Sequence, residues 1–76
     1  MQQKAYEITI EEDGGSIRVK ERAAVITVNL LYARAAASQM ARKHKAPLTI
    51  RIYADGFLIC RRNFLANGKA KNWIYY

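Results

Sequence analysis

The stretch "TIRIYADGFLICRR", Thr49 to Arg62, decides the fold of this chain. Apolar residues alternate with other residues on both sides of Asp55-Gly56, a dipeptide that favours the tight two-residue turn of a β-hairpin. With that turn at the centre, one side of the hairpin is purely apolar: the register pairs Ile52 with Ile59 and Ala54 with Phe57. We therefore expect a hairpin with one face in the core.

The opposite side of this hairpin is not a neutral polar surface. The same register pairs Thr49 with Arg62, Arg51 with Cys60 and Tyr53 with Leu58 there. The solvent-exposed face of an antiparallel sheet is usually polar, so two arginines, a tyrosine and a leucine together on that face are more than solvation requires. This face is therefore a candidate binding surface.

The segment "AYEITIEEDGGSIRVKE", residues 5–21, predicts a second hairpin around Asp13-Gly14. That turn pairs residues of like or complementary character, namely Ile10 with Ile17, Ile8 with Val19, Thr9 with Arg18 and Glu7 with Lys20. The β-branched run "VITV", residues 25–28, follows a break near residues 22–24. It either prolongs the second strand past a bulge or forms a strand of its own.

The alanine-rich segment "LLYARAAASQMARKHK", residues 30–45, predicts a helix capped by Asn29. The 3.6-residue period assigns the inward face to Leu30, Ala33, Ala37, Met40, Ala41 and His44. Arg34, Ser38, Arg42 and Lys45 form an outward basic ridge. Arg42, Lys43 and Lys45 also suit a last helical turn, because cations there stabilise the helix dipole. We expect His44 to pack or cap and not to bind a ligand.

The C-terminal third completes the sheet. Pro47 ends the helix, Asn67-Gly68 predicts a turn, and "WIYY", residues 73–76, predicts a last strand. Trp73 and Tyr75 share one face of that strand and Ile74 and Tyr76 the other, so we expect one of these pairs in the core and the other outside. The expected fold is α+β: one helix packed on a four- to five-stranded antiparallel sheet, in the order ββαβββ, as a single domain over residues 1–76.

Length and composition limit the classes of protein. A chain of 76 residues has a small core and little room for a deep cleft between lobes. The chain has neither an apolar run of membrane-spanning length nor a signal-peptide core at its start, so we expect a cytoplasmic protein without membrane partners. The single cysteine, Cys60, cannot form an internal disulfide, and we expect it to be a small buried hydrophobe.

Charge is distributed unevenly. Residues 1–28 hold four cations and five anions, whereas residues 29–76 hold nine cations and a single acid, Asp55. Such a field attracts polyanions, so the expected partner is a nucleic acid, a nucleoprotein complex or an acidic protein surface. The alternative is a surface charge that only keeps a small protein soluble.

Two groups of side chains are candidate binding sites. The first lies on the C-terminal sheet face and consists of Arg51, Tyr53, Arg62, Lys69 and Lys71; the second is the helix ridge of Arg34, Arg42 and Lys45. Cations neutralise phosphates while aromatic rings stack on unpaired bases, although the same aromatic residues could simply fill the core. No metal cluster, phosphate loop or nucleophile with its base is present in the sequence. We therefore expect no cofactor and no enzymatic activity.

A strand hairpin, an alanine-rich helix, "IRIYADGFLICRR" and the terminal "NGKAKNW" resemble, in this order, the small phage-borne anti-CRISPR proteins with a helix on a bent antiparallel sheet. The resemblance implies an inhibitor, monomeric or dimeric, that docks on a CRISPR–Cas effector in the host cytoplasm and interferes with target DNA binding. Many such inhibitors are acidic mimics of DNA, and this chain is basic. The alternative function is a stand-alone DNA- or RNA-binding module that uses a basic, aromatic sheet face.

Overall fold

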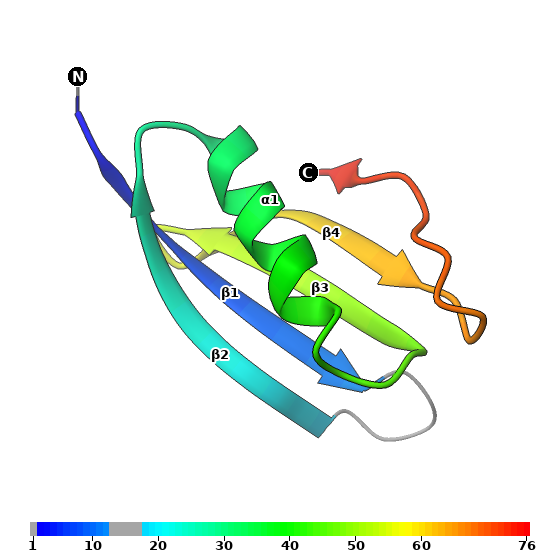
Figure 1. Cartoon of the computed structure of the whole chain (residues 1–76). Helices are drawn as coiled ribbons and strands as arrows, with labels where there is room; N and C mark the ends of the chain where they lie inside the picture. Colours follow the sequence, from blue (N-terminus) through cyan, green and yellow to red (C-terminus); the bar gives the residue numbers. More distant parts are fainter. Residues whose placement is uncertain (1, 13–17) are drawn as a thin grey trace.

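A computed structural model describes residues 2–12 and 18–76 of the chain. One helix lies diagonally across one face of a bent five-stranded sheet (Figure 1). The elements along the chain are β1 (Lys4–Glu12), β2 (Arg18–Thr27), α1 (Leu30–Ala41), β3 (Leu48–Ala54), β4 (Phe57–Phe64) and β5 (Ile74–Tyr75). All neighbours are antiparallel, in the sheet order β2-β1-β3-β4-β5. The predicted α+β class is confirmed.

The core lies between α1 and the two central strands. Ile8 and Ile10 of β1 face Ile52 and Ile50 of β3, and all four side chains are fully buried. Each stabilises the fold by about 1.5 to 3 kcal/mol relative to an exposed position. Three alanines of α1 cover them, Ala33, Ala37 and Ala41, as the helical period predicts. Their small side chains let the helix lie close to the sheet.

The helix begins where the sequence predicts and ends earlier. The Asn29 side chain accepts a hydrogen bond of 3.2 Å from the Tyr32 backbone N–H, which confirms the N-cap. α1 ends at Ala41, so the prediction that Arg42, Lys43 and Lys45 form its last turn is wrong. Across the described residues, no helix has both the length and the hydrophobicity needed to cross a bilayer.

The register of the first hairpin differs from the prediction. Ile8 faces Ala23 and not Val19, while Glu12 faces Arg18. The predicted Asp13-Gly14 turn lies outside the described residues. The observed register extends the β1–β2 ladder to Thr27, past a bulge near Glu11. In this register the β-branched run of Val25, Ile26 and Thr27 pairs with β1, and β-branched residues favour strands.

The second hairpin has the predicted turn and a shifted register beyond it. Asp55 and Gly56 have φ angles of 53° and 82°, as a primed two-residue turn requires, and Ala54 faces Phe57 as predicted. An irregularity between Ile52 and Tyr53 then moves the register by one residue, so that Ile52 faces Cys60 and not Ile59. Because successive residues point to opposite faces, every residue of β4 after the bulge changes side.

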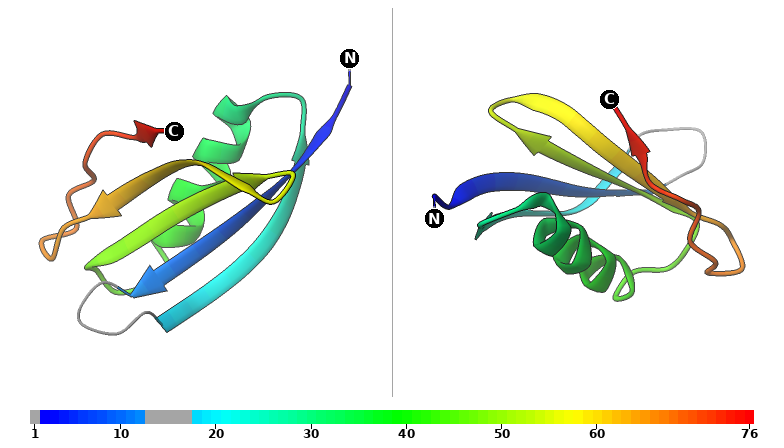
Figure 2. Two further views of the ribbon diagram at one scale, coloured as in Figure 1. Left: turned by 180° about the vertical axis from the view of Figure 1, so that it is seen from behind. Right: turned by 90° about the horizontal axis from the view of Figure 1, so that it is seen from above.

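The last strand lies at the edge beside β4 and is short. Tyr75 faces Cys60, and Ile74 faces Arg61. Cys60 is fully buried, as the sequence predicts for a small hydrophobe, but it lies on the helix side and not on the opposite face, where the predicted register placed it. This places Tyr75 on the helix side as well. Trp73 is half-buried and packs against the core, but Tyr75 on the same face is exposed, as are Ile74 and Tyr76. The expectation that one complete pair of the last strand lies in the core is therefore wrong. The segment between β4 and β5 runs along this edge of the molecule (Figure 2).

Candidate nucleic-acid interface

Four of the five acidic side chains among the described residues form ion pairs with cations, and these four lie on one half of the molecule. These ion pairs are Lys4 with Asp55, Lys20 with Glu12, Lys43 and His44 with Glu21, and Arg51 with Glu11. The acids lie on β1, on β2 and at the β3–β4 turn. That half therefore neutralises much of its own charge, and the remaining cations belong mainly to α1, β4 and the C-terminal segment.

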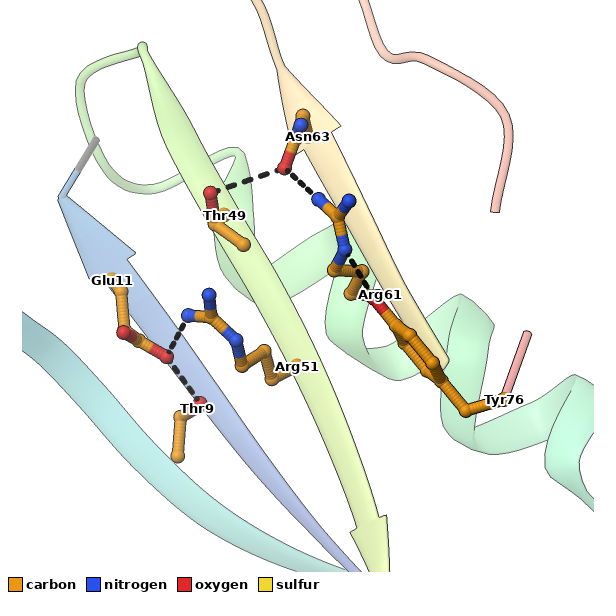
Figure 3. Close-up of polar contacts among 7 residues, drawn as sticks. All are labelled: Thr9, Glu11, Thr49, Arg51, Arg61, Asn63 and Tyr76. Atoms are coloured by element: carbon orange, nitrogen blue, oxygen red, sulfur yellow. Dashed lines mark hydrogen bonds and ion pairs between the residues drawn. The ribbon is translucent and has the colours of Figure 1, made fainter. Parts of the chain in front are cut away.

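No described helix covers the other face of the sheet, which we call the open face (Figure 2, left). On this face an acidic side chain neutralises Arg51, which the sequence analysis had selected as a candidate ligand. Arg51 Nη1 lies 2.5 Å from Glu11 Oε2, and Thr9 Oγ1 donates to the same oxygen at 3.2 Å (Figure 3). Thr9 and Glu11 are buried even though they lie on this open face. Arg51 thus compensates a buried carboxylate and is not available as a phosphate ligand.

Four further polar side chains of the open face form hydrogen bonds with one another. Asn63 Oδ1 accepts hydrogen bonds from Thr49 Oγ1 at 3.1 Å and from Arg61 Nη1 at 3.4 Å, and Arg61 Nε donates to the Tyr76 hydroxyl (Figure 3). Tyr53 faces Glu7 of β1 and lines a hollow of about 550 Å³ that is also lined by Asp55 and Arg22. Two carboxylates against one guanidinium disfavour a polyanion beside Tyr53.

Arg62 lies on the helix side, so its predicted place on the open face is wrong. Its Nη1 donates to Ser38 Oγ of α1 at 3.2 Å, and its Nε donates to the Lys71 backbone carbonyl at 2.7 Å. The guanidinium carbon lies 5.2 Å from the centre of the Trp73 ring. The one-residue bulge in β4 causes this change of face. The five residues of the first predicted site are therefore not brought together on one sheet face.

Arg34 of α1 reaches the same tryptophan from the helix. Its guanidinium carbon lies 5.4 Å from the centre of the Trp73 ring and 5.7 Å from that of Tyr75. Its Nε is buried, and among the described residues it has no hydrogen-bond partner. Neither Arg34 nor Arg62 forms an ion pair with a carboxylate of the described residues. Cation–π contact therefore holds two uncompensated arginines at one indole.

Three adjoining hollows run along α1 from this arginine pair, and we call them together the α1 groove. The first has a volume of about 210 Å³ and is lined by Leu31, Arg34, Ala35, Ser38, Arg62 and Trp73. The second shares Ala35 and Ser38 with it, and the third shares Arg42 with the second. The third, of about 540 Å³, lies between the end of α1 and residues 64–70. No Asp or Glu among the described residues lines any of the three.

The groove joins residues that the sequence had assigned to two separate sites. Arg34, Arg42 and Lys45 of the helix ridge line it together with Arg62 of the sheet site. The backbone of Lys71 holds Arg62 in place. Lys69 follows the Asn67-Gly68 turn, and the Lys69 backbone N–H donates a hydrogen bond to the Asn67 side chain.

His44 and Cys60 have structural roles: His44 pairs with an acid of β2, and Cys60 lies in the core. His44 Nε2 donates to Glu21 Oε1 at 2.7 Å, and this hydrogen bond is the main cause that lowers the pKa of Glu21, with a further contribution from Lys43. Burial raises the pKa of the Cys60 thiol. Among residues 2–12 and 18–76, no group of three His, Cys, Asp or Glu side chains could hold a metal ion.

Comparison of the chain with protein-family models, with curated proteins and with solved structures gave no match. The site must therefore be interpreted from its own geometry. Sequence reasoning missed the role of Trp73 as the contact between Arg34 and Arg62. The alternation of Trp73 and Tyr75 was visible in the sequence, but the bulge that brings Arg62 to the same side was not.

Proposed function

We propose that this protein is a small, basic, non-catalytic binding protein that holds nucleic acid, free or within a nucleoprotein complex, in the α1 groove. One observation carries the proposal: Arg34 and Arg62 converge on Trp73 without a carboxylate from the described residues. Two neighbouring cations without an acid repel each other, and a bound phosphate relieves that repulsion through charge-assisted hydrogen bonds.

The open face of the sheet is a weaker candidate for the same ligand. Arg51 already compensates Glu11, and Tyr53 lies near Glu7 and Asp55. A phosphate there would compete with a buried carboxylate for its partner, which costs more than an exposed ion pair gains. The α1 groove also offers Arg42 and Lys45 beyond the arginine pair, so a chain of phosphates finds several cations in succession.

The order of elements supports a more specific proposal, that of an anti-CRISPR-type inhibitor. In this function the α1 groove docks on the nucleic acid of a CRISPR–Cas effector complex and interferes with target DNA binding. A basic inhibitor differs from acidic DNA mimics because it binds the nucleic acid itself, or an acidic protein surface, and not the nucleic-acid-binding site of the effector.

Direct binding and capture from the host together test this proposal. Fluorescence anisotropy with labelled DNA and RNA oligonucleotides should show binding that weakens steeply as salt rises, because phosphate contacts release counterions. A pull-down from the native host, with and without nuclease, should recover a complex that contains nucleic acid.

Recovery of a multisubunit effector with its guide RNA supports the inhibitor. Recovery of mixed nucleic acid that nuclease removes supports a stand-alone module. If no oligonucleotide binds at low salt and only a protein without nucleic acid is captured, the proposal is wrong, and the cations serve solubility or a protein contact.

A further inference from the structure

The end of the α1 groove at Trp73 has more apolar surface than a phosphate site needs. Leu31 and Ala35 of α1 line the 210 Å³ hollow together with the Trp73 ring. Leu31 is 61% exposed, and Tyr75, whose ring lies beside the Arg34 guanidinium, is 52% exposed. An aliphatic side chain and an aromatic ring thus remain open to solvent next to two uncompensated cations.

This combination distinguishes between the two forms of nucleic acid. A duplex presents phosphates and sugars outward while its bases stack on one another, so it meets the cations and leaves the apolar surface unused. An unpaired base has two free faces that stack on aromatic rings and on guanidinium planes. Each such contact raises affinity by about 5- to 150-fold.

On the basis of the proposed nucleic-acid binding, we propose that this end of the groove takes single-stranded nucleic acid. An unpaired base packs against Leu31 and Tyr75 while the adjoining phosphate binds Arg34 and Arg62. Trp73 contacts both arginines and is a positioning residue, because its ring already holds their guanidinium groups at 5.4 and 5.2 Å.

Trp73 also provides the measurement, because it is the only tryptophan of the chain. The probes are twelve-nucleotide oligo-dT and oligo-U, a DNA duplex with the same number of phosphates, and an abasic strand of the same length. We expect both single strands to change Trp73 fluorescence and to bind at least about fivefold more tightly than the duplex and the abasic strand. The DNA and RNA strands show which sugar the site accepts.

Two neighbouring tyrosines give a matched pair of variants. Tyr75→Ala should weaken oligo-dT binding by about fivefold or more and leave abasic-strand binding unchanged. Tyr76→Ala removes the same ring from the open side, where it contacts Arg61, and should change neither affinity. Circular dichroism of both variants checks that each is folded.

Equal affinity for oligo-dT and the abasic strand would overturn the inference, and so would a preference for duplex. Either result leaves the proposed function in place, since nucleic acid still binds through its phosphates. Failure of all four probes to bind at low salt would overturn direct nucleic-acid binding and this inference with it.

Discussion

Individual side chains divide the cations of this protein into two kinds. Arg51 has a carboxylate partner in Glu11, whereas Arg34 and Arg62 have an aromatic ring. A carboxylate neutralises a guanidinium, but a ring only positions it and leaves its charge available to a ligand. The candidate site is therefore located by the group that contacts each arginine, a carboxylate or an aromatic ring, more than by the number of cations.

Cys60 should be chemically inert in the folded protein. Its side chain has no exposed surface, and burial raises the pKa of the thiol, so both access and the reactive thiolate are lacking. We expect a thiol reagent such as dithionitrobenzoate to react more than about a hundredfold more slowly in native buffer than in urea, because reaction follows the open fraction. Similar rates in the two solutions would contradict the buried position.

Glu21 should make the folding stability of the protein depend on pH in the acidic range. Its hydrogen bond with His44 lowers its pKa below the usual 4.5, so its contribution to stability is present above that value and is lost as pH falls through the lowered pKa. Urea unfolding at several pH values should therefore show that Glu21→Gln is less stable than the wild type at pH 7. The difference should shrink as the pH falls below 4.5. A difference that stays constant down to pH 2 would contradict the contact.

Among the elements, α1 depends on its row of alanines. Ala33 and Ala37 have no exposed surface, and Ala41 has almost none, so the helix and the sheet meet without room for a larger side chain. Three small residues on one face allow this close approach, whereas the exposed face of the same helix carries Leu31, Tyr32 and Ala35.

Ala37→Leu should destabilise the protein by about 1 to 3 kcal/mol, because the added atoms overpack the interface between helix and sheet. Ala35→Leu makes the same change on the exposed face and should alter stability by no more than about 0.5 kcal/mol. Chemical denaturation monitored by circular dichroism measures both. Equal effects of the two substitutions would mean that the helix packs on the sheet through another face.

The two hairpins show how far sequence reasoning reaches. Alternation and the Asp55-Gly56 turn predicted the second hairpin, its turn and its first two pairs correctly. A bulge shifts the register of a strand by one residue without an obvious signal in the local sequence. Here the bulge moved Arg62 from the predicted open face to the helix side. In the first hairpin the alternation was equally clear, yet the observed register pairs Ile8 with Ala23, four residues beyond the predicted Val19.

The candidate site was predictable only in part for the same reason. The sequence identified Arg34, Arg42, Lys45 and Arg62 as candidate ligands but assigned them to two surfaces. Their common groove depends on the face of Arg62 and on the position of Trp73 after the Asn67-Gly68 turn. Both are tertiary features, set by a bulge and by a bridge between Phe64 and Ala70.

At the scale of the whole molecule, the protein is divided by charge. The acids of the described residues lie on β1, β2 and the β3–β4 turn, where four of the five pair with cations, while most cations of α1, β4 and the C-terminal segment have no carboxylate partner among these residues. A polyanion approaching such a molecule is attracted to one side, and that attraction falls as salt rises. Four of the cations that form no ion pair among the described residues line the α1 groove, namely Arg34, Arg42, Lys45 and Arg62.

The most direct measurement compares the salt dependence of oligonucleotide binding in two double variants of equal net charge. Arg34→Gln/Arg62→Gln changes the α1 groove, and Arg22→Gln/Arg61→Gln changes two cations of the open face. Arg51 is left intact in both, since its loss would strand the buried Glu11 carboxylate.

The groove variant should bind more weakly and lose about 1.4 to 1.8 from the slope of log affinity against log salt, as expected for two lost phosphate contacts. The open-face variant should keep the wild-type slope. If instead the open-face variant loses the slope and the groove variant keeps it, nucleic acid binds the uncovered face of the sheet and not the α1 groove.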